Sequence, residues 1–453
     1  MKKFLIISAI ICFSFSIVND GNYIFAQNGI NSPFSRYGFG SLSDRSMGFN
    51  KGMAGISQGI RDKQIINMAN PAAYSEVDSI TALFDFGLSI QNGNYHLDNM
   101  RYNAKNSSID YLAFHFRATR NVGIAFGVLP FTNINYNFAT ESQPTDGSTS
   151  ITNTSTYVGS GGLHQIMLGT GWRFIKNASI GFNISYLFGN YSHSVTTSFS
   201  DNTIYSSYKS SSADINTYTL NVGAQYWINL NKKDKLTLGF TYGLGHNINN
   251  DEKNITSIVR SSDSSLDTTI VSNAFQYPHT FAVGVAYNHT YKWLAGMDFE
   301  LQKWSKCRFP NAKGTISASS GIAATNNLND QIRISVGGAY RPSLVSDNLF
   351  QKMQYKVGVY YAQCYANADY THTISDKPHE FGLSAGVSIP LNTRHLYIKN
   401  NIPVLHLTGQ WVYSNIPYID NVLQAKKTLT ENYLKFSIGL TFSERWFNKW
   451  KFQ

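Results

Sequence analysis

Apolar and polar residues alternate with a period of two through most of the chain from residue 79 onward. In the segment 436–442, for example, Phe, Ile, Leu and Phe alternate with Ser, Gly and Thr. The segments 234–243 and 379–390 repeat this pattern. A period of two predicts a β-strand with one apolar face and one face of polar or small residues.

This strand pattern recurs about fourteen times, each time over about 9–11 residues, which is the length of a strand that crosses a bilayer. The sequence therefore predicts an all-β fold, a single closed transmembrane antiparallel β-barrel of about 14 strands. The predicted strand cores are 80–90, 110–118, 122–136, 163–175, 178–190, 216–229, 234–246, 278–288, 292–304, 331–340, 355–365, 379–390, 402–413 and 432–442.

The connections between these strands alternate in length. Long links fall at 91–109, 137–162, 191–215, 247–277, 305–330, 366–378 and 414–431, and the links between them are mostly shorter. Bacterial barrels have short periplasmic turns and long external loops, so an even strand count places both termini in the periplasm. We expect several long links to extend strands above the membrane, and 253–273 to form an extra external hairpin.

Composition supports a barrel over other membrane or nucleic-acid-binding classes. Charged residues make up 14% of the chain and aromatic residues 14%, and the mean hydropathy is −0.22. No stretch beyond the N-terminus reaches the about 18 continuous apolar residues of a membrane-spanning helix. The net charge of +10 is scattered, without a basic helix or zinc-finger spacing, which argues against nucleic acid as a partner.

The N-terminus predicts a secretory signal peptide over 1–26. Lys2 and Lys3 precede an apolar stretch, 4–18, and cleavage is expected after Ala26. An exported chain that alternates in this way belongs in the outer membrane of a bacterial cell, in contact with lipid and lipopolysaccharide.

Residues 27–78 do not alternate and are rich in glycine. Because glycine lets the backbone approach a wall closely, we expect this segment to enter the lumen as a plug, ahead of a barrel over 79–442. The alternative is a disordered periplasmic leader.

The C-terminal end carries two further signals. The last predicted strand is similar to the signal read by the outer-membrane assembly machinery, which would insert the barrel. The tail 443–453 mixes aromatic and basic residues and is expected either to anchor at the membrane interface or to fold under the barrel, in the periplasm.

The segment 47–75 resembles the N-terminal plug of the FadL family of outer-membrane barrels. It carries glycines followed by Asn70, Pro71, Ala72 and Ala73, and the family has an Asn-Pro-Ala element just before its first strand. The resemblance implies a fourteen-stranded barrel with a small N-terminal hatch that takes up long-chain fatty acids or aromatic hydrocarbons. The opening stretch 31–40 resembles the leader of FadL-like barrels of the Bacteroidota, which include members in protein secretion or assembly.

The alternation also assigns faces. With the aliphatic residues toward lipid, the polar and charged residues expected to face the lumen are Asp85, His115, Arg117, Arg173, Asp298, Glu300, Arg333, Lys356, His406 and Lys435. They would fill the interior, clamp the plug through charge pairs, or line a polar path. Many inward positions are glycines, which leave room for an occupant.

Enzyme chemistry is not indicated. Asp298 and Glu300 are consecutive inward carboxylates, as in some glycosidases, but salt bridging to Arg333 on the next strand is the simpler interpretation. The histidines lack metal-site spacing, so no metal or cofactor is expected. Cys307 and Cys364 are expected to remain unpaired thiols.

Two functions follow from these features. The first is a plugged channel for uptake of hydrophobic small molecules such as long-chain fatty acids. Its plug would move near residues 70–74, or a kinked strand would release the ligand into the bilayer. The alternative is a non-transporting barrel that is a subunit or partner of an outer-membrane protein secretion or assembly complex.

Overall fold

The computed structural model describes residues 32–78, 81–97, 100–142, 151–201, 203–260, 263–290, 292–310, 328–343, 346, 348–366, 377–391, 402–420 and 425–445. The expected signal peptide, the first residues of the expected plug and the tail beyond 445 lie outside these residues. The last strand continues to Arg445, so the barrel ends three residues later than the predicted boundary at 442.

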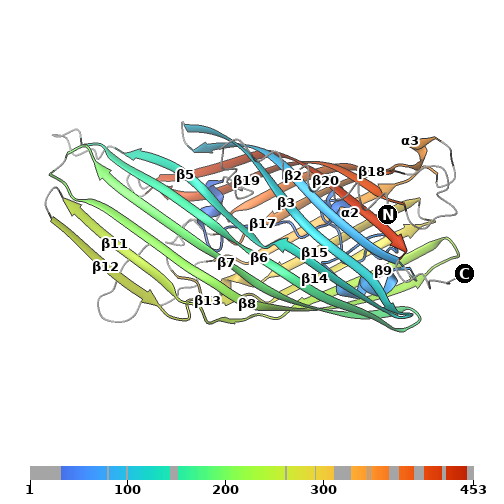
Figure 1. The fold of residues 1–453 in the computed structure, drawn as a ribbon. Coiled ribbons are helices and arrows are strands. Elements are labelled where there is room, and N and C mark those ends of the chain that lie inside the picture. The colour runs from blue at the N-terminus through green and yellow to red at the C-terminus, as the bar shows by residue number, and fades with distance from the viewer. Residues whose placement is uncertain are drawn as a thin grey trace, which may run out of the picture.

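Fourteen strands close into one antiparallel barrel, as the alternation predicts (Figure 1). Each strand pairs with its neighbour along the chain, and β2 pairs with β20 to close the ring. The ring consists of β2 (Thr81–Leu97), β3 (Met100–Thr119), β4 (Val122–Pro130) continued by β5 (Thr132–Ser142), β6 (Asn153–Ile175), β7 (Ala178–Phe199), β8 (Ser206–Asn229), β9 (Asp234–Gly243), β14 (Thr280–His289), β15 (Trp293–Gln302), β16 (Gln331–Tyr340), β17 (Gln354–Gln363), β18 (His379–Pro390), β19 (Val404–Asp420) and β20 (Ala425–Arg445).

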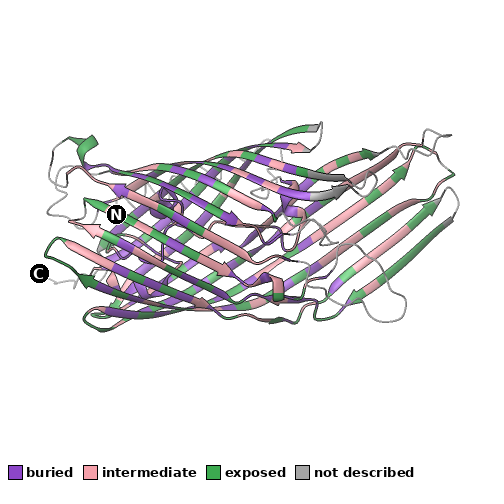
Figure 2. Ribbon diagram, turned by 180° about the vertical axis from the view of Figure 1, so that it is seen from behind, coloured by how far each residue is buried: buried purple, intermediate pink, exposed green. Residues whose placement is uncertain are grey.

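Burial follows the predicted alternation (Figure 2). Along β17, buried and exposed residues alternate at nearly every position. On β20, Ile438 is 52% exposed on the outer face, whereas Ser437 is 5% exposed on the inner face. The outer face is therefore an apolar surface for lipid, and the inner face encloses a polar lumen. Among the described residues, no helix is both long and apolar enough to cross a membrane.

The two ends of the barrel differ. At the short-turn end, strands meet in tight connections such as 120–121, 176–177 and 230–233. At the other end, which we call the extended end, several expected links are strand. Most of 91–109, for example, forms the continuation of β2 and β3. The reason is that their Ser-, Thr- and Asn-rich sequences still pair edge to edge above the apolar band.

Two further details concern the strands near the extended end. The expected hairpin forms from β11 (Glu252–Arg260) and β12 (Asp263–Val271), and β11 pairs with β8. Beside it, β10 (His246–Ile248) pairs with β13 (Phe275–Tyr277). The single strand expected over 122–136 is instead interrupted at Phe131, whose N–H bonds to the Leu163 carbonyl while its side chain joins an aromatic cluster in the lumen.

Residues 32–78 lie inside the barrel, and we call them the inner segment (Figure 1). Two short helices, η3 (Trp304–Lys306) and α3 (Leu349–Lys352), lie in connections of the wall. The inner segment itself contains η1 (Pro33–Arg36), β1 (Ser41–Leu42), α2 (Gly48–Lys51) and η2 (Pro71–Glu76). It starts at the extended end, where Ser32 donates to Glu431, and reaches the short-turn end before β2. β1 pairs with β5.

Candidate functional site

The inner segment makes a circuit of the lumen and touches nearly every wall strand. α2 packs against β18, β19, β20 and β2, whereas η2 packs against β4, β6, β7 and β8. Between them, Met53 lies over β16 and β17, and Gln58 lies over β9 and β14. The candidate functional site is therefore the contact between this segment and the wall.

A belt of wall glycines makes room for the circuit. Several are direct cross-strand partners, so the absent side chains leave recesses that extend across neighbouring strands. The three runs of paired glycines are Gly123–Gly171–Gly181–Gly223, Gly239–Gly284 and Gly296–Gly337–Gly358.

The belt glycines are needed because backbone meets backbone there. A Cβ at Gly239 would overlap the Gln58 carbonyl, and one at Gly181 would overlap Pro71. These clashes are with main-chain atoms, which cannot rotate away. The belt glycines are thus explained by an occupant, which is the chain's own inner segment.

The Asn70–Ala73 element has a clear structural role at the start of η2. The Asn70 Oδ1 accepts the N–H of Ala72 at 3.1 Å, and its Nδ2 donates to the Gln58 carbonyl at 3.0 Å. Pro71 occupies the first helical turn, where a missing N–H costs nothing. One side chain thus caps the helix and ties two turns of the inner segment together.

Asp298 and Glu300 both hold the inner segment. The Asp298 carboxylate accepts the backbone N–H groups of Ser57 at 2.6 Å and Gln58 at 2.9 Å. Glu300 forms an ion pair with Arg45 at 3.0 Å. The expected salt bridge to Arg333 is therefore wrong, although Arg333 is the direct cross-strand partner of Glu300.

Arg333 and Lys356 instead donate to carbonyl groups of the inner segment. Arg333 Nη2 reaches the Ala54 carbonyl at 3.3 Å, and its guanidinium lies 3.9 Å from the ring centroid of Tyr360. Lys356 Nζ donates to the Phe49 carbonyl at 3.0 Å and lies over the Phe49 ring. Two cations of the wall thus bind main-chain oxygens of the inner segment.

A buried charge pair joins α2 to β3. Lys51 contacts Asp110, and both side chains are almost wholly buried. The expected lumen residue Lys435 stands 3.7 Å from the same carboxylate. Asp85 is also buried and accepts from the Tyr111 hydroxyl, which accepts in turn from the N–H of Gly48. Removing one member of such a network would leave a buried polar group without its partner.

The two expected lumen histidines take part in hydrogen bonds. The Nε2 of His115 lies 2.9 Å from the Tyr74 carbonyl in η2. His406 bridges Ser388 and Thr441 across three neighbouring strands, at 2.7 and 3.0 Å. No group of three or more His, Cys, Asp or Glu side chains is placed to hold a metal within the described part of the chain. Cys307 and Cys364 are free thiols in the structure.

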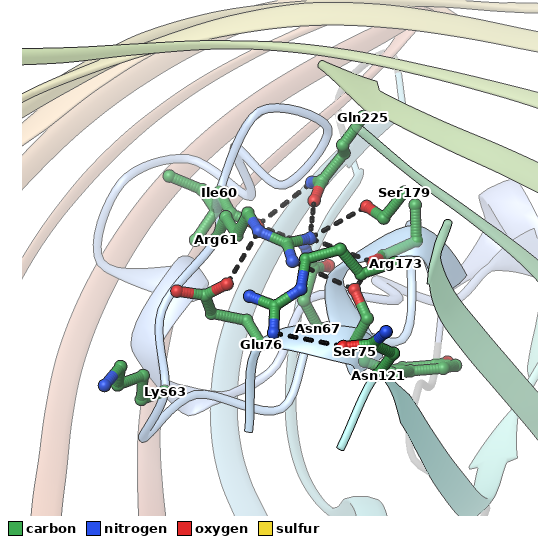
Figure 3. Close-up of polar contacts among 12 residues, drawn as sticks. Ile60, Arg61, Lys63, Asn67, Ser75, Glu76, Asn121, Arg173, Ser179 and Gln225 are labelled. Atoms are coloured by element: carbon green, nitrogen blue, oxygen red, sulfur yellow. Dashed lines mark hydrogen bonds and ion pairs between the residues drawn. The ribbon is translucent and has the colours of Figure 1, made fainter. Parts of the chain in front are cut away.

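Arg117 and Arg173 face the lumen only at the short-turn end, where both are half-buried. Arg117 donates to carbonyls of its own turn, and Arg173 lies 3.5 Å from the Asn121 side chain (Figure 3). Neither forms a hydrogen bond or an ion pair with a described residue of the inner segment, whereas Asp298, Glu300, Arg333 and Lys356 do.

Arg61 was not singled out by the alternation because it lies in the non-periodic segment. Its guanidinium pairs with Glu76 at 2.9 Å and donates to Ser75, Ser179 and Gln225 (Figure 3). It also lies 4.0 Å from the Trp227 ring centroid. Burial lowers the pKa of Arg61 to about 10, against the opposing effect of Glu76, so it stays charged at neutral pH. The charged run at 61–63 is the only sequence signal for it.

A cavity of about 270 Å³ remains between the inner segment and the barrel wall. Charged residues of both signs line it, including Asp44, Arg45, Arg333, Glu380 and Lys435. Ligand sites for apolar molecules are predominantly apolar, and this lining is not. The cavity suits water or a polar molecule better than an acyl chain.

Comparison with known proteins agrees with this architecture. A family model described as BamG matches residues 1–453. No curated protein sequence matches the chain. The Pseudomonas putida toluene transporter TodX has a similar structure, with a TM-score of 0.55 and 13% identity over 90% of this chain and 100% of TodX. A Pseudomonas aeruginosa FadL homologue gives 0.56 and 13% over 89% and 99%, and the monoaromatic hydrocarbon channel CymD gives 0.54 and 13% over 90% and 99%. At these identities the likeness establishes the FadL-type fold.

Proposed function

The chain belongs to the BamG family, and from that premise we propose that it is a closed barrel that acts as a subunit or partner of the outer-membrane protein assembly machinery. The family's name points to that machinery, and the family model covers the whole chain. The likeness to hydrocarbon channels is at 13% identity and concerns the fold. This reverses the order of the two functions drawn from the sequence.

The observation that carries the proposal is the set of buried polar contacts between the inner segment and the barrel wall. We infer that residues 27–78 are a plug, with Asn70–Ala73 as the element that shapes its last turn. Buried groups on opposite walls hold it, including Asp298 on β15, Lys356 on β17 and Asp110 on β3. Moving such a segment would break many buried polar contacts at once, each worth about 1–3 kcal/mol if left unsatisfied. A barrel closed in this way would act through its surfaces.

The orientation belongs to the same proposal. Bacterial barrels place short turns in the periplasm, so we infer that the short-turn end and both termini are periplasmic. The extended end, with the β11–β12 hairpin, would then face the outside. Both ends would be available to partner proteins.

The test is affinity purification of the full chain from outer membranes in mild detergent after crosslinking. We expect a stoichiometric complex that contains components of the outer-membrane protein assembly machinery. The control is an unrelated outer-membrane barrel with the same tag and similar abundance. Recovery of this protein alone, or of the same proteins as with the control, would contradict the proposal.

Uptake of hydrophobic small molecules is the second candidate function. It is supported by the shared fold with TodX, CymD and a FadL homologue, and long-chain fatty acids are one substrate class to test. Transport requires the inner segment to move. A Cβ at Gly52 would lie 3.1 Å from the Lys356 Cβ. A disulfide has a Cβ–Cβ distance of about 3.5–4.5 Å, so a shift of about half an ångström admits the bond.

The pair Gly52→Cys and Lys356→Cys, with Cys307 and Cys364 changed to Ser, therefore locks the segment to β17 when oxidised. Fatty-acid uptake that stops on oxidation and returns on reduction would favour transport. Unchanged growth and an intact complex in the oxidised protein are expected if the barrel serves assembly. Each single-cysteine variant is the control for the lost glycine or lysine.

A further inference from the structure

Positive charge gathers at the short-turn mouth of the lumen. The described charged residues around this mouth include six cations and the three carboxylates of Asp62, Glu76 and Asp78. We call the cations the mouth cluster, which consists of Arg61, Lys63, Arg117, Arg173, Lys235 and Arg341. Figure 3 shows Arg61 and Arg173 with Lys63 nearby.

The strand members of the cluster face inward. Arg117 is the cross-strand partner of Gly123, which belongs to the glycine belt. Arg173 lies two residues beyond Gly171, and Lys235 two residues before the buried Thr237. Since side chains two apart on a strand share a face, these three cations point into the mouth and away from lipid.

Five of the six cations, all but Arg341, are linked by mutual repulsion. Arg173 is close enough to both Arg117 and Arg61 to repel them. Lys235 interacts in the same way with Arg61 and Lys63. Like charges held together in this way raise the local potential, and a low-dielectric wall focuses it further.

The nearby carboxylates are largely used by the inner segment itself. Glu76 pairs with Arg61, and Asp78 pairs with Lys63, both at 2.9 Å. Within the described residues, Arg117 and Arg173 have no carboxylate at ion-pair distance, and neither has Lys235. Asp62, Glu76 and Asp78 offset part of the charge on Arg117, Lys235 and Arg341. The mouth therefore keeps an excess of positive charge at a half-exposed surface.

We propose that the short-turn mouth docks an acidic segment of a partner protein. Anionic lipid headgroups would meet the outward rim, whereas these cations line the mouth, which favours a protein segment that can reach in. Complementary charge would steer the encounter and fix the orientation of the two partners. The inference rests on the proposed role as a partner in assembly and names the face that the partner uses.

The experiment measures binding of a fluorescent deca-glutamate peptide to the full chain in neutral detergent micelles, by anisotropy. The mouth variant carries Arg117→Glu, Arg173→Glu and Lys235→Glu. The rim variant carries Arg120→Glu, Lys176→Glu and Lys232→Glu, which change the net charge equally but lie in the turns outside the mouth cluster. Heat-modifiable migration on gels checks that each variant folds.

We expect about a tenfold or larger loss of affinity in the mouth variant and less than about twofold in the rim variant. Equal losses in both variants, or no binding to the native chain, would overturn the proposal. The proposal would also be overturned if the mouth variant lost binding to vesicles that contain anionic lipid to the same degree as it lost peptide binding. The mouth would then be a lipid contact.

Crosslinked purification of the same variants separates this inference from the function that it rests on. If the native chain and the mouth variant both recover the assembly complex, the docking face is wrong and the function stands. If the native chain recovers no complex while peptide binding still depends on the mouth, the assembly function is wrong.

Discussion

The Asp298 carboxylate on β15 accepts the backbone N–H of Gln58 from inside the lumen, at 2.9 Å. It also accepts the N–H of Ser57, and all three residues are buried. A side chain that satisfies two main-chain donors fixes the turn between α2 and η2 against the wall.

Asp298→Ala is expected to lower the free energy of unfolding by about 2 kcal/mol, because two buried N–H groups lose their acceptor. Urea-induced unfolding in detergent, followed by tryptophan fluorescence, measures this. Limited proteolysis should also cut the inner segment faster. Asp267→Ala on the exposed strand β12 is the matched control and should change neither. A proteolysis pattern that stays native in Asp298→Ala would contradict the role of this contact.

Gly239→Ala tests the glycine belt. Its new Cβ would overlap the Gln58 carbonyl, so either the segment moves or the barrel distorts, at a cost of about 1–3 kcal/mol. Gly409→Ala is the control, because a Cβ there makes only ordinary contact with Phe436. The thermal midpoint of the heat-modifiable band is the measurement. Equal midpoints in the two variants would show that the segment does not press on the belt.

The Lys51–Asp110 pair is expected to behave as a coupled unit. Lys51→Met leaves a buried carboxylate with Lys435 at 3.7 Å as its remaining cation, and should cost about 3 kcal/mol. Asp110→Asn in addition should recover part of that loss, since the uncompensated charge is gone. A double-mutant cycle from urea unfolding gives the coupling energy, and a value near zero would refute the pairing.

Arg61→Lys separates charge from geometry. Lysine keeps the positive charge beside Glu76 but cannot reproduce the planar fork that reaches Ser75, Ser179 and Gln225. We expect at least half of the loss seen in Arg61→Ala, which should itself be about 3 kcal/mol. Unfolding of both variants under one condition decides this. Full stability in Arg61→Lys would mean that charge alone matters there.

The barrel follows from the local sequence pattern. A period of two dictates which side chains share a face, and lipid tolerates only one of the two faces, so strand count and outward residues follow from local pattern. The same logic predicted Asp298, Lys356 and Lys435 to point inward, and in the structure Asp298 and Lys356 are buried. It overestimated the length of the links at the extended end. There the strands continue to pair beyond the apolar band, where no lipid-facing apolar residues alternate with polar ones to mark them as strands.

The binding partners of the inward groups, in contrast, depend on the three-dimensional fold. Asp298 and Glu300 are two residues apart on one face, yet one holds backbone N–H groups and the other holds Arg45. The belt glycines are scattered in sequence and come together as cross-strand pairs through strand register. The inner segment has no periodicity, because its neighbours come from strands all round the lumen. Contacts of that kind depend on three-dimensional closure, which no local pattern encodes.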